Sequence, residues 1–222
     1  MKLFSHLRVS SEFSITQGLL TIDQIVDNAV ENSVPSVALT DKSNMFGLVK
    51  FFNKCESAGI KPISGSSIRL IFEDDDVSYE LLCLAKTNNG HRNLMKIISN
   101  AHNNNSFNLP IIKFNDLIKL KDDIVVISGG KGSHIFEYLK LGNTPEAVSR
   151  IDNFRNHFGD DFVIDIQMTN RLDEMEYIKN VLPISKDKGI PLIATNDVLF
   201  SKQEDFGIHE TKVCINTGKT LN

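Results

Sequence analysis

Charged and polar side chains follow several short apolar stretches of this sequence, at the places where strands are expected to end. They are Arg8 and Ser10, Asp41 and Lys42, and Asn196 and Asp197, and Ser67 joins them from within the third stretch. In an α/β barrel the carboxyl ends of the strands meet at one edge, and the residues that do chemistry gather there. Two acids and two cations at such an edge can hold a metal or a phosphate, or can neutralise one another.

Alternating strand and helix patterns would position these side chains. The clearest helical patterns are Thr21–Asn32 and Gly47–Ala58, with apolar residues three and four positions apart. Seven apolar stretches have the length of a strand, namely Leu3–Val9, Ser36–Thr40, Lys61–Ile71, Tyr79–Ala85, Ile124–Ser128, Phe162–Ile166 and Pro191–Thr195. Repeated βα units predict a parallel sheet, open or closed, and seven strands favour a barrel.

Several residues indicate where helices begin and end. Thr21 with Gln24 forms a capping box in the sequence, which predicts a helix start. Gly59 and Gly189 stand where helices should stop before the next strand. Pro183 lies inside the helical pattern Asp173–Lys188, and it predicts a kink or a break there.

The remaining motifs are better explained by structure than by chemistry. The acidic stretch Glu73–Asp76 and the Asn-rich stretch His102–Asn108 are expected to be solvated surface loops. The glycines of Gly129–Ser133 favour a strand-to-helix turn over a phosphate cradle, because no Gly-Lys-Ser/Thr ending follows. Gly218–Thr220 resembles the end of a P-loop, but no glycine stands five residues before it. Phe51 and Phe52 are expected in the core.

The composition is that of a globular protein that is not inserted in a membrane. The chain has 222 residues, of which 41% are hydrophobic and 23% charged, and its apolar runs are far shorter than the ~20 residues of a bilayer helix. The N-terminus lacks the apolar stretch of a secretory signal, so we expect a cytoplasmic location. The three cysteines, Cys55, Cys83 and Cys214, fit reduced thiols rather than disulfides.

The charge balance argues against tight DNA binding by this chain. The formal net charge is -4 and the isoelectric point is near 5.9. A nucleic-acid-binding domain usually carries a clustered basic surface instead. If DNA matters to the function, we expect other domains to contact it.

Five segments of the chain, in order and at plausible spacing, resemble the N-terminal PHP domain of bacterial DNA polymerase III alpha subunits. They are HLRVSSEFS, VALTDKSNMFGLVKFFNKCESAGIKPISGSSI, LLCLAKTNNGHRNLMKIIS, VISGG and IPLIATNDVLFSKQEDFGIHE. The resemblance implies an α/β fold, a distorted (β/α)7, TIM-like barrel. It also implies a single PHP domain over residues 1–222, which we expect to be an N-terminal fragment of a much longer polymerase chain.

Family members with an intact site resemble metal phosphoesterases that bind zinc or manganese. By this resemblance the metal-site positions are vestigial here, and they fall on Arg8 and Ser10 for a His-x-His pair, Asp41 and Lys42 for an Asp-His pair, Ser67 for a glutamate, Glu80 for a histidine, and Asp197 and Leu199 for the closing Asp-x-His. His209 aligns with a histidine common in the polymerase family, and we expect it to pack or to form a hydrogen bond.

The loss of these ligands predicts a site without metal. Of the family's ligands only Asp41 and Asp197 survive, and two carboxylates alone make a weak, magnesium-like site. The ammonium group of Lys42 at a ligand position would also repel a divalent cation. We therefore expect no metal, or at most one held by these two acids, and no metal-dependent hydrolysis.

The resemblance implies a structural and interactive role. In the family this domain braces the rest of the alpha subunit and docks the separate proofreading exonuclease subunit of the polymerase III core. The parent chain would be a DNA-directed DNA polymerase of DNA replication, a nucleotidyltransferase that uses magnesium, with its active site outside these residues. We expect no catalytic residue and no cofactor in this fragment.

Two alternatives remain open at this point. One is an active PHP-type metal-dependent phosphoesterase or pyrophosphatase, in which Glu12, Asp41, Glu80 and Asp197 form a rearranged carboxylate site. The other is a barrel enzyme acting on a small phosphorylated molecule, with Arg8 and Lys42 binding the phosphate. Metal content separates the first from the docking role, and stabilisation by phosphate or sugar phosphates would support the second.

Overall fold

The computed structural model describes residues 4–103, 109–128 and 130–221. The chain divides into two compact units, which we call unit 1 (Met1–Ser66 and Asp197–Asn222) and unit 2 (Ser67–Asn196). The division falls inside strand β2 (Lys61–Ile71), so this strand contributes residues to both units. That residues 1–222 form a single PHP domain stays a prediction.

The described residues of unit 1 contain one parallel strand pair and three longer helices. Its elements are α1 (Ile22–Glu31), β1 (Ser36–Leu39), α2 (Leu48–Ala58), the first part of β2, the short 3-10 helix η2 (Gln203–Asp205) and α8 (Phe206–Thr217). β1 runs parallel to β2, with Ser36 opposite Lys61 and Leu39 opposite Ser64. The predicted strand Leu3–Val9 is wrong for the described residues, because only Val9 pairs, in an isolated bridge to Val198.

The predicted ends of α1 and α2 are confirmed. Thr21 and Gln24 form the capping box, in which the Thr21 side chain accepts a hydrogen bond from the Gln24 backbone. Gly59 ends α2 with a φ of 70°, a left-handed conformation that glycine adopts without steric cost.

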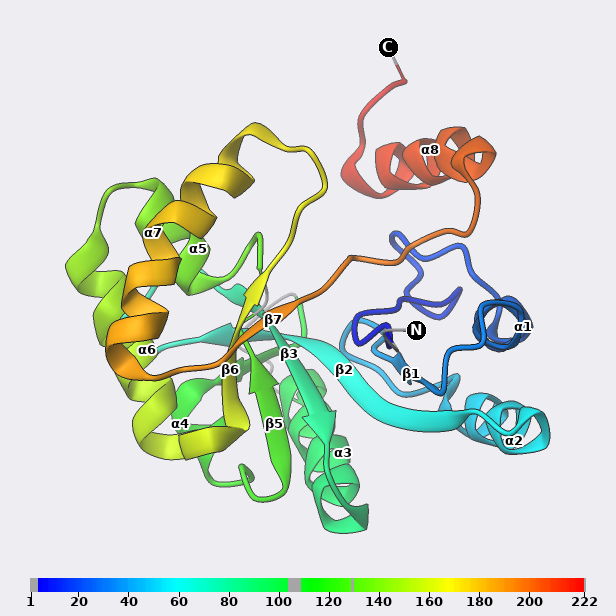
Figure 1. The fold of residues 1–222 in the computed structure, drawn as a ribbon, viewed down its shortest axis with the longest axis horizontal. Coiled ribbons are helices and arrows are strands. Elements are labelled where there is room, and N and C mark those ends of the chain that lie inside the picture. The colour runs from blue at the N-terminus through cyan, green and yellow to red at the C-terminus, as the bar shows by residue number, and fades with distance from the viewer. Residues whose placement is uncertain (1–3, 104–108, 129, 222) are drawn as a thin grey trace. The chain divides into compact units, whose positions relative to one another are not determined.

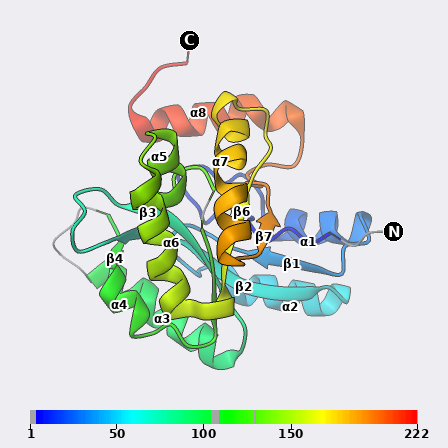
Figure 2. The same cartoon turned by 60° about the vertical axis from the view of Figure 1, so that its left-hand side comes forward.

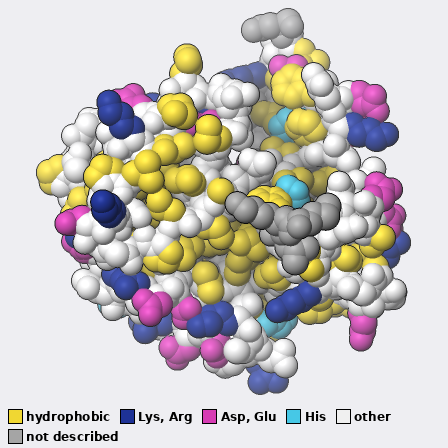
Figure 3. Space-filling model, in the orientation of Figure 1, with side chains coloured by type: hydrophobic (Ala, Val, Ile, Leu, Met, Phe, Trp, Pro, Cys, Tyr) yellow, Lys and Arg dark blue, Asp and Glu magenta, His cyan; other side chains and the backbone are white. Residues whose placement is uncertain are grey.

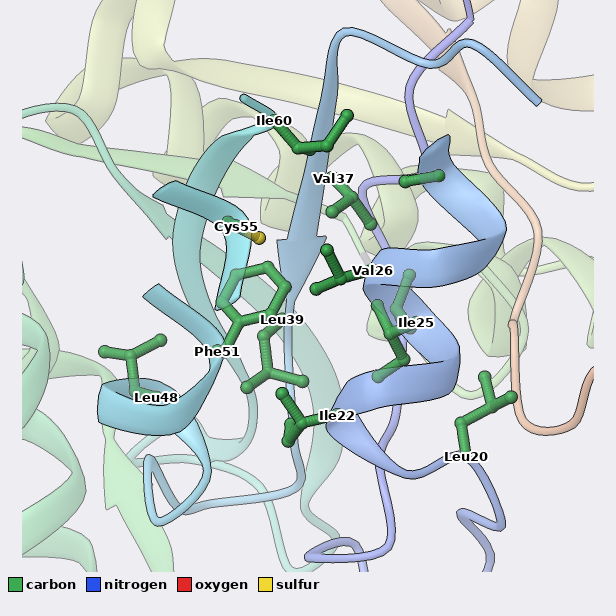
Figure 4. Close-up of a cluster of buried hydrophobic side chains, with 12 residues drawn as sticks. Leu20, Ile22, Ile25, Val26, Val37, Leu39, Leu48, Phe51, Cys55 and Ile60 are labelled. Atoms are coloured by element: carbon green, nitrogen blue, oxygen red, sulfur yellow. The ribbon is translucent and has the colours of Figure 1, made fainter. Parts of the chain in front are cut away.

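The core of unit 1 lies where α1 and α2 face β1. Ile22 and Val26 of α1 and Phe51 of α2 point toward Leu39 of β1 (Figure 4). These side chains come from the periodic positions of the helices, as the apolar spacing predicts. Phe51 is fully buried, which confirms its predicted core role, whereas its neighbour Phe52 is 38% exposed.

Unit 2 contains the rest of the sheet and five α-helices among its described residues. After β2 its elements are β3 (Tyr79–Ala85), α3 (Asn88–Asn103), β4 (Ile111–Lys113), α4 (Phe114–Ile118), β5 (Ile124–Ile127), α5 (His134–Lys140), α6 (Thr144–Phe158), the 3-10 helix η1 (Gly159–Asp161), β6 (Phe162–Ile166), α7 (Leu172–Lys188) and β7 (Leu192–Ala194). Figures 1 and 2 show α5, α6 and α7 next to one another, and α3 alongside β3.

The sheet is mixed, so the prediction of an all-parallel sheet is wrong. β5, β6 and β7 run parallel, but β3 runs antiparallel to β5, with Leu82 opposite Ile127. Neighbouring parallel strands must be joined by a long crossover, usually a helix. The segment that joins β2 to β3, residues 72–78, is too short for such a crossover, so β3 does not follow β2 as a parallel neighbour. Strand β4 escaped prediction because it has only three residues, which pair with β2 from Arg69 opposite Ile111.

Helix α7 continues through its proline. Of the kink or break predicted at Pro183, the break is wrong, since the helix runs unbroken from Leu172 to Lys188, and the kink stays a prediction. Pro183 and Lys179 are both exposed, so water can satisfy the Lys179 carbonyl group that loses its intrahelical partner. Gly189 ends the helix with a φ of 63°, as predicted.

Across the described part of the chain, no helix combines the length and the apolar character needed to cross a membrane.

Candidate functional site

Three chain segments of unit 1 lie side by side and carry most of the predicted site positions. The Val9 carbonyl group accepts a hydrogen bond from the Thr40 backbone N–H at 2.9 Å. On the other side, Ser10 N donates to Val198 O at 3.0 Å, and Val198 N donates to Arg8 O at 3.1 Å. These backbone hydrogen bonds place the three segments next to one another. The predicted site positions on them are Arg8, Ser10, Asp41, Lys42, Asp197 and Leu199.

The Asp41 carboxylate is held by two serines of the loop that follows the first segment. Asp41 is buried, with 1% of its surface exposed. Its Oδ1 atom accepts hydrogen bonds from Ser11 N at 2.7 Å and from Ser14 Oγ at 2.6 Å. Its Oδ2 atom accepts one from Ser11 Oγ at 2.7 Å. Each carboxylate oxygen has about two lone-pair sites, so these donors occupy most of what Asp41 could offer to a metal ion.

The hydroxyl protons of both serines are directed at Asp41. Ser11 Oγ accepts a hydrogen bond from Phe13 N at 3.2 Å, and Ser14 Oγ accepts one from Lys42 N at 3.1 Å. Since these N–H groups occupy hydroxyl lone pairs, the hydroxyl protons point the other way, toward the carboxylate. A cation placed beside Asp41 would therefore meet hydrogen-bond donors.

The loop from Ser11 to Gly18 is fixed from a second direction by α8, within unit 1. His209 Nδ1 lies 2.9 Å from Gln17 O, and Lys212 Nζ donates to Gly18 O. His209 thus has the hydrogen-bonding role expected of it. Gly18 allows the loop to close, because a Cβ atom there would lie 1.9 Å from Ser11 O.

The other predicted positions differ in burial. Arg8 and Ser10 are buried, Asp197 is exposed, and Lys42 and Leu199 are intermediate. In unit 2, Ser67 is buried and Glu80 is intermediate. Among the residues that the structure describes, no three His, Cys, Asp or Glu side chains gather to hold a metal ion. That the eight positions are remnants of a metal site stays a prediction, as does the absence of a metal.

A second buried acid, in unit 2, was missed by sequence reasoning. Asp165 in β6 is fully buried, and both of its carboxylate oxygens accept hydrogen bonds from the Thr195 hydroxyl, at 2.8 and 2.9 Å. Gln167 Nε2 lies 3.3 Å from Asp165 Oδ2, and the Asp165 backbone N–H donates to Ser128 Oγ. The available signal was an acid inside the apolar stretch FVIDI, because buried acids need hydrogen-bond partners.

The turn after β5 comes close to this acid. Gly130 has a φ of 56°, and a Cβ atom there would lie 2.8 Å from Gln167 Cδ and 3.1 Å from Asp165 Oδ2. The turn then leads to Ser133, which caps α5 by accepting a hydrogen bond from Phe136 N. For residues 130–133 the predicted strand-to-helix turn is confirmed, while Gly129 lies outside the described residues. Gly218, from the other phosphate-like motif, simply ends α8 in a left-handed conformation.

The prediction that Glu73–Asp76 is a solvated loop is wrong for Asp75. The side chain of Asp75 is only 10% exposed, and its Oδ1 atom lies 2.9 Å from Arg150 Nη2. Arg150 also pairs with Asp74 and Glu146, each at 3.0 Å, and its guanidinium lies 4.2 Å from the centre of the Phe72 ring. The acidic loop is therefore held against α6 by a nearly buried arginine.

Of the other predicted loop, residues 104–108 lie outside the described residues, and His102 and Asn103 end α3.

His134 lies beside the same acid. Its Nε2 atom is 3.5 Å from Asp75 Oδ2, and its ring packs 4.0 Å from the Tyr79 ring, centre to centre. Burial lowers the pKa of His134 to about 3, so the imidazole is neutral at pH 7. Burial also raises the pKa of Asp75. All of these residues belong to unit 2, where they form a structural network.

The three cysteines are free thiols, as predicted. Cys55 and Cys83 are buried, and burial raises the pKa of their thiols to about 11 and about 12. Such thiols are not ionised at neutral pH, so they are poor nucleophiles and poor metal ligands.

The family model and the similar proteins point to the same family. A family model described as PHP domain matches residues 6–169. The chain is 34% identical over 220 residues to the DNA polymerase III subunit alpha of Pasteurella multocida and 34% identical over 222 residues to that of Escherichia coli K12. It is 36% identical over 221 residues to that of Pseudomonas aeruginosa. Each alignment covers 99% of this chain and 19% of the relative, so the chain spans about a fifth of these relatives' length.

Solved structures confirm the predicted α/β fold class. A Bifidobacterium adolescentis protein named as a candidate metal-dependent phosphoesterase superposes with a TM-score of 0.62 at 11% identity, over 96% of this chain and 97% of its own. An amidohydrolase from Chromobacterium violaceum gives a TM-score of 0.55 at 12% identity, over 94% of this chain and 96% of its own. At these identities the likeness concerns the fold alone.

Proposed function

Because the chain belongs to the PHP-domain family, we propose that it is the N-terminal PHP domain of a replicative DNA polymerase III alpha subunit, degenerate as a metal phosphoesterase. Its role is structural: it braces the rest of the alpha subunit and docks the proofreading exonuclease subunit. Nucleotide transfer, its magnesium ions and most DNA contacts belong to other parts of the parent polymerase, which acts in the cytoplasm.

The observation that carries the loss of hydrolysis is the environment of Asp41. In a metal site this carboxylate would direct its lone pairs at a cation. Here Ser11 and Ser14 direct three hydrogen bonds at it. These three hydrogen bonds come from neutral donors and stabilise the ionised carboxylate of Asp41. A carboxylate stabilised in this way does not need a metal ion.

The exposed apolar side chains of unit 2 support a docking role. Leu172 and Met175 lie three residues apart on α7, and they are 100% and 61% exposed. Met168, in the loop before α7, and Leu141, after α5, are also exposed. Figure 3 shows hydrophobic side chains gathered over the part of the surface that α5, α6 and α7 form. Exposed apolar patches of this kind mark protein interaction sites.

The loss of hydrolysis is tested by metal content and activity. We expect the purified chain to hold no stoichiometric zinc or manganese and to leave nucleotides, pyrophosphate and model phosphodiesters intact. Chelator-sensitive hydrolysis that disappears in an Asp41→Ala, Asp197→Ala double variant would instead establish the rearranged carboxylate site.

The docking role is tested with the exonuclease subunit from the same organism. We expect a complex by size-exclusion chromatography and calorimetry, weakened at least tenfold by Leu172→Glu combined with Met175→Glu. Val49→Glu is the matched control, because Val49 is also largely exposed but belongs to unit 1. Absence of a complex with the unaltered chain would refute docking. Equal weakening by the control would show that α7 is not the contact surface.

A further inference from the structure

The outward side of α7 carries a regular row of exposed side chains, which we call the α7 seam. It consists of Leu172, Met175, Lys179, Leu182 and Lys186, spaced alternately three and four residues apart. Its three apolar members, in chain order, are 100%, 61% and 44% exposed. The buried residues of α7 occupy the positions in between, and they are Glu174, Tyr177, Val181 and Ser185. The seam therefore points away from the core of unit 2.

The spacing of the seam is that of the two contact positions in a coiled-coil heptad. In a coiled coil these positions are buried between two helices, where each side chain enters a hole formed by the facing helix. An extended segment repeats its side chains every two residues, so it matches a row with this spacing poorly. The α7 seam therefore fits a helix better than it fits a strand.

Two lysines interrupt the apolar seam. Lys179 lies at its centre and Lys186 at its C-terminal end. Neither forms an ion pair with another residue that the structure describes. The exposed acids of α7, Glu176 and Asp187, lie beside the seam positions rather than in them. A helix that covers the seam removes water from Lys179, and an ammonium group that loses water needs a counter-charge.

The central lysine argues against a second copy of this chain as the partner. Two copies that pair along the whole seam, parallel or antiparallel, would place Lys179 of one copy beside Lys179 of the other. Like charges brought together in this way repel each other. A different helix with an acidic side chain at this level would instead supply the missing counter-charge.

We propose that the α7 seam binds an amphipathic, acidic helix of the docking partner, which places an acidic side chain against Lys179. The apolar side chains of that helix cover Leu172, Met175 and Leu182. This inference rests on the docking role proposed above, and it adds the secondary structure and the charge of the docked segment. The acid opposite Lys179 fixes the register of the helix, as a single polar residue does in a coiled-coil seam.

Lys179→Met tests for the acid, because methionine is a long apolar side chain without the charge of lysine. Binding of the 222-residue chain to the exonuclease subunit from the same organism is measured by calorimetry. We expect Lys179→Met to raise the Kd about tenfold or more, since the partner's acid would be left covered and unpaired. Lys96→Met is the matched control, because Lys96 is also an exposed lysine of unit 2 but lies on α3. It should leave the Kd within about twofold.

Leu182→Glu tests for a continuous helix along the seam. Leu182 lies ten residues from Leu172 on α7, which is about 15 Å along the helix axis. A partner helix that follows the seam contacts both ends, so we expect Leu182→Glu to weaken binding about tenfold or more. Melting curves establish that each variant is folded, and all the substituted side chains are exposed.

The outcomes separate this inference from the docking role itself. A Kd that Lys179→Met leaves unchanged or lowers, or that Leu182→Glu leaves unchanged, overturns the acidic helix even where the double variant of Leu172 and Met175 weakens binding. A dimer of the unaltered chain in sedimentation equilibrium that Leu182→Glu disrupts would assign the seam to a second copy instead. Absence of any complex removes the docking role, and this inference with it.

Discussion

At the scale of single residues, the buried acids of this chain are stabilised by hydroxyl, amide and backbone donors. Asp41 receives its hydrogen bonds from Ser11 and Ser14, and Asp165 receives its own from Thr195 and Gln167. Asp75 is different, because it pairs with the guanidinium of Arg150. Hydrogen bonds to a charged group contribute about 1.5–3 kcal/mol each, so these contacts are worth measuring singly.

Ser14→Ala should lower the free energy of unfolding by about 1–3 kcal/mol, because Asp41 loses one charge-assisted hydrogen bond in a buried place. Urea denaturation gives the value. Ser57→Ala is the control, since Ser57 lies exposed on α2 and its hydroxyl donates to Asn53 O within the same helix. We expect a change within about 0.5 kcal/mol there. If Asp41→Asn leaves the cost of Ser14→Ala unchanged, the two side chains are not coupled and our account of Asp41 fails.

Unfolding should become easier between pH 7 and pH 5 because of His134. Its folded-state pKa, about 3, lies below the unfolded value of 6.5, so the unfolded chain binds more protons in this window. The stabilisation is fully present above pH 6.5 and is lost as the pH falls toward 3, by roughly 2 kcal/mol at pH 5. Asp75 acts in the opposite direction, since a carboxyl group whose pKa rises on folding gains stability as the pH falls.

His134→Phe tests this pH dependence, because phenylalanine keeps the ring contacts to Phe72 and Tyr79 and cannot titrate. The free energy of unfolding is measured by urea at pH 7 and pH 5. The drop between the two should be smaller in the variant by roughly 2 kcal/mol. The same drop in both proteins would show that His134 is protonated normally in the folded state.

At the scale of elements, the loop from Ser11 to Gly18 links the candidate site to α8. It is closed by the backbone bond from Gly18 N to Ser14 O, at 2.8 Å, and it is held by His209 and Lys212 of α8. Only the folded chain shows that this loop encloses the Asp41 carboxylate.

Gly18→Ala should disrupt this loop, because the new methyl group would lie 1.9 Å from the Ser11 carbonyl oxygen unless the backbone moves. We expect a loss of at least about 2 kcal/mol in the free energy of unfolding. Gly207→Ala is the control, since nothing lies within 4 Å of a Cβ atom there and alanine favours the helix. Thermal unfolding of the two variants compares them directly, and similar melting temperatures would mean that the loop adapts freely.

At the scale of the whole molecule, the net negative charge argues against tight DNA binding by this chain. The net charge is -4, whereas DNA-binding affinity comes largely from lysine and arginine contacts to phosphates. We expect binding to short duplex and single-stranded DNA to be weak or absent at physiological salt. Fluorescence anisotropy at two salt concentrations measures it. A sub-micromolar Kd that rises steeply with salt would show a basic surface that the net charge conceals.

The sequence by itself determined those elements whose pattern depends on near neighbours. β2, β3 and β6 begin and end at the predicted residues, and α1 starts at the capping box of Thr21 and Gln24. Apolar periodicity and caps act over a few residues, which is why they can be recognised without a structure.

Only the tertiary structure decided the direction of β3, the burial of Asp75 and the hydrogen bonds of Asp41. Ser14 and Asp41 are 27 residues apart in the sequence, and Asp75 and Arg150 are 75 apart. The partners of a polar side chain depend on the path of the whole chain, and many paths are compatible with the same local pattern. A run of acids therefore looks solvated in the sequence until a distant arginine is placed beside it by the fold.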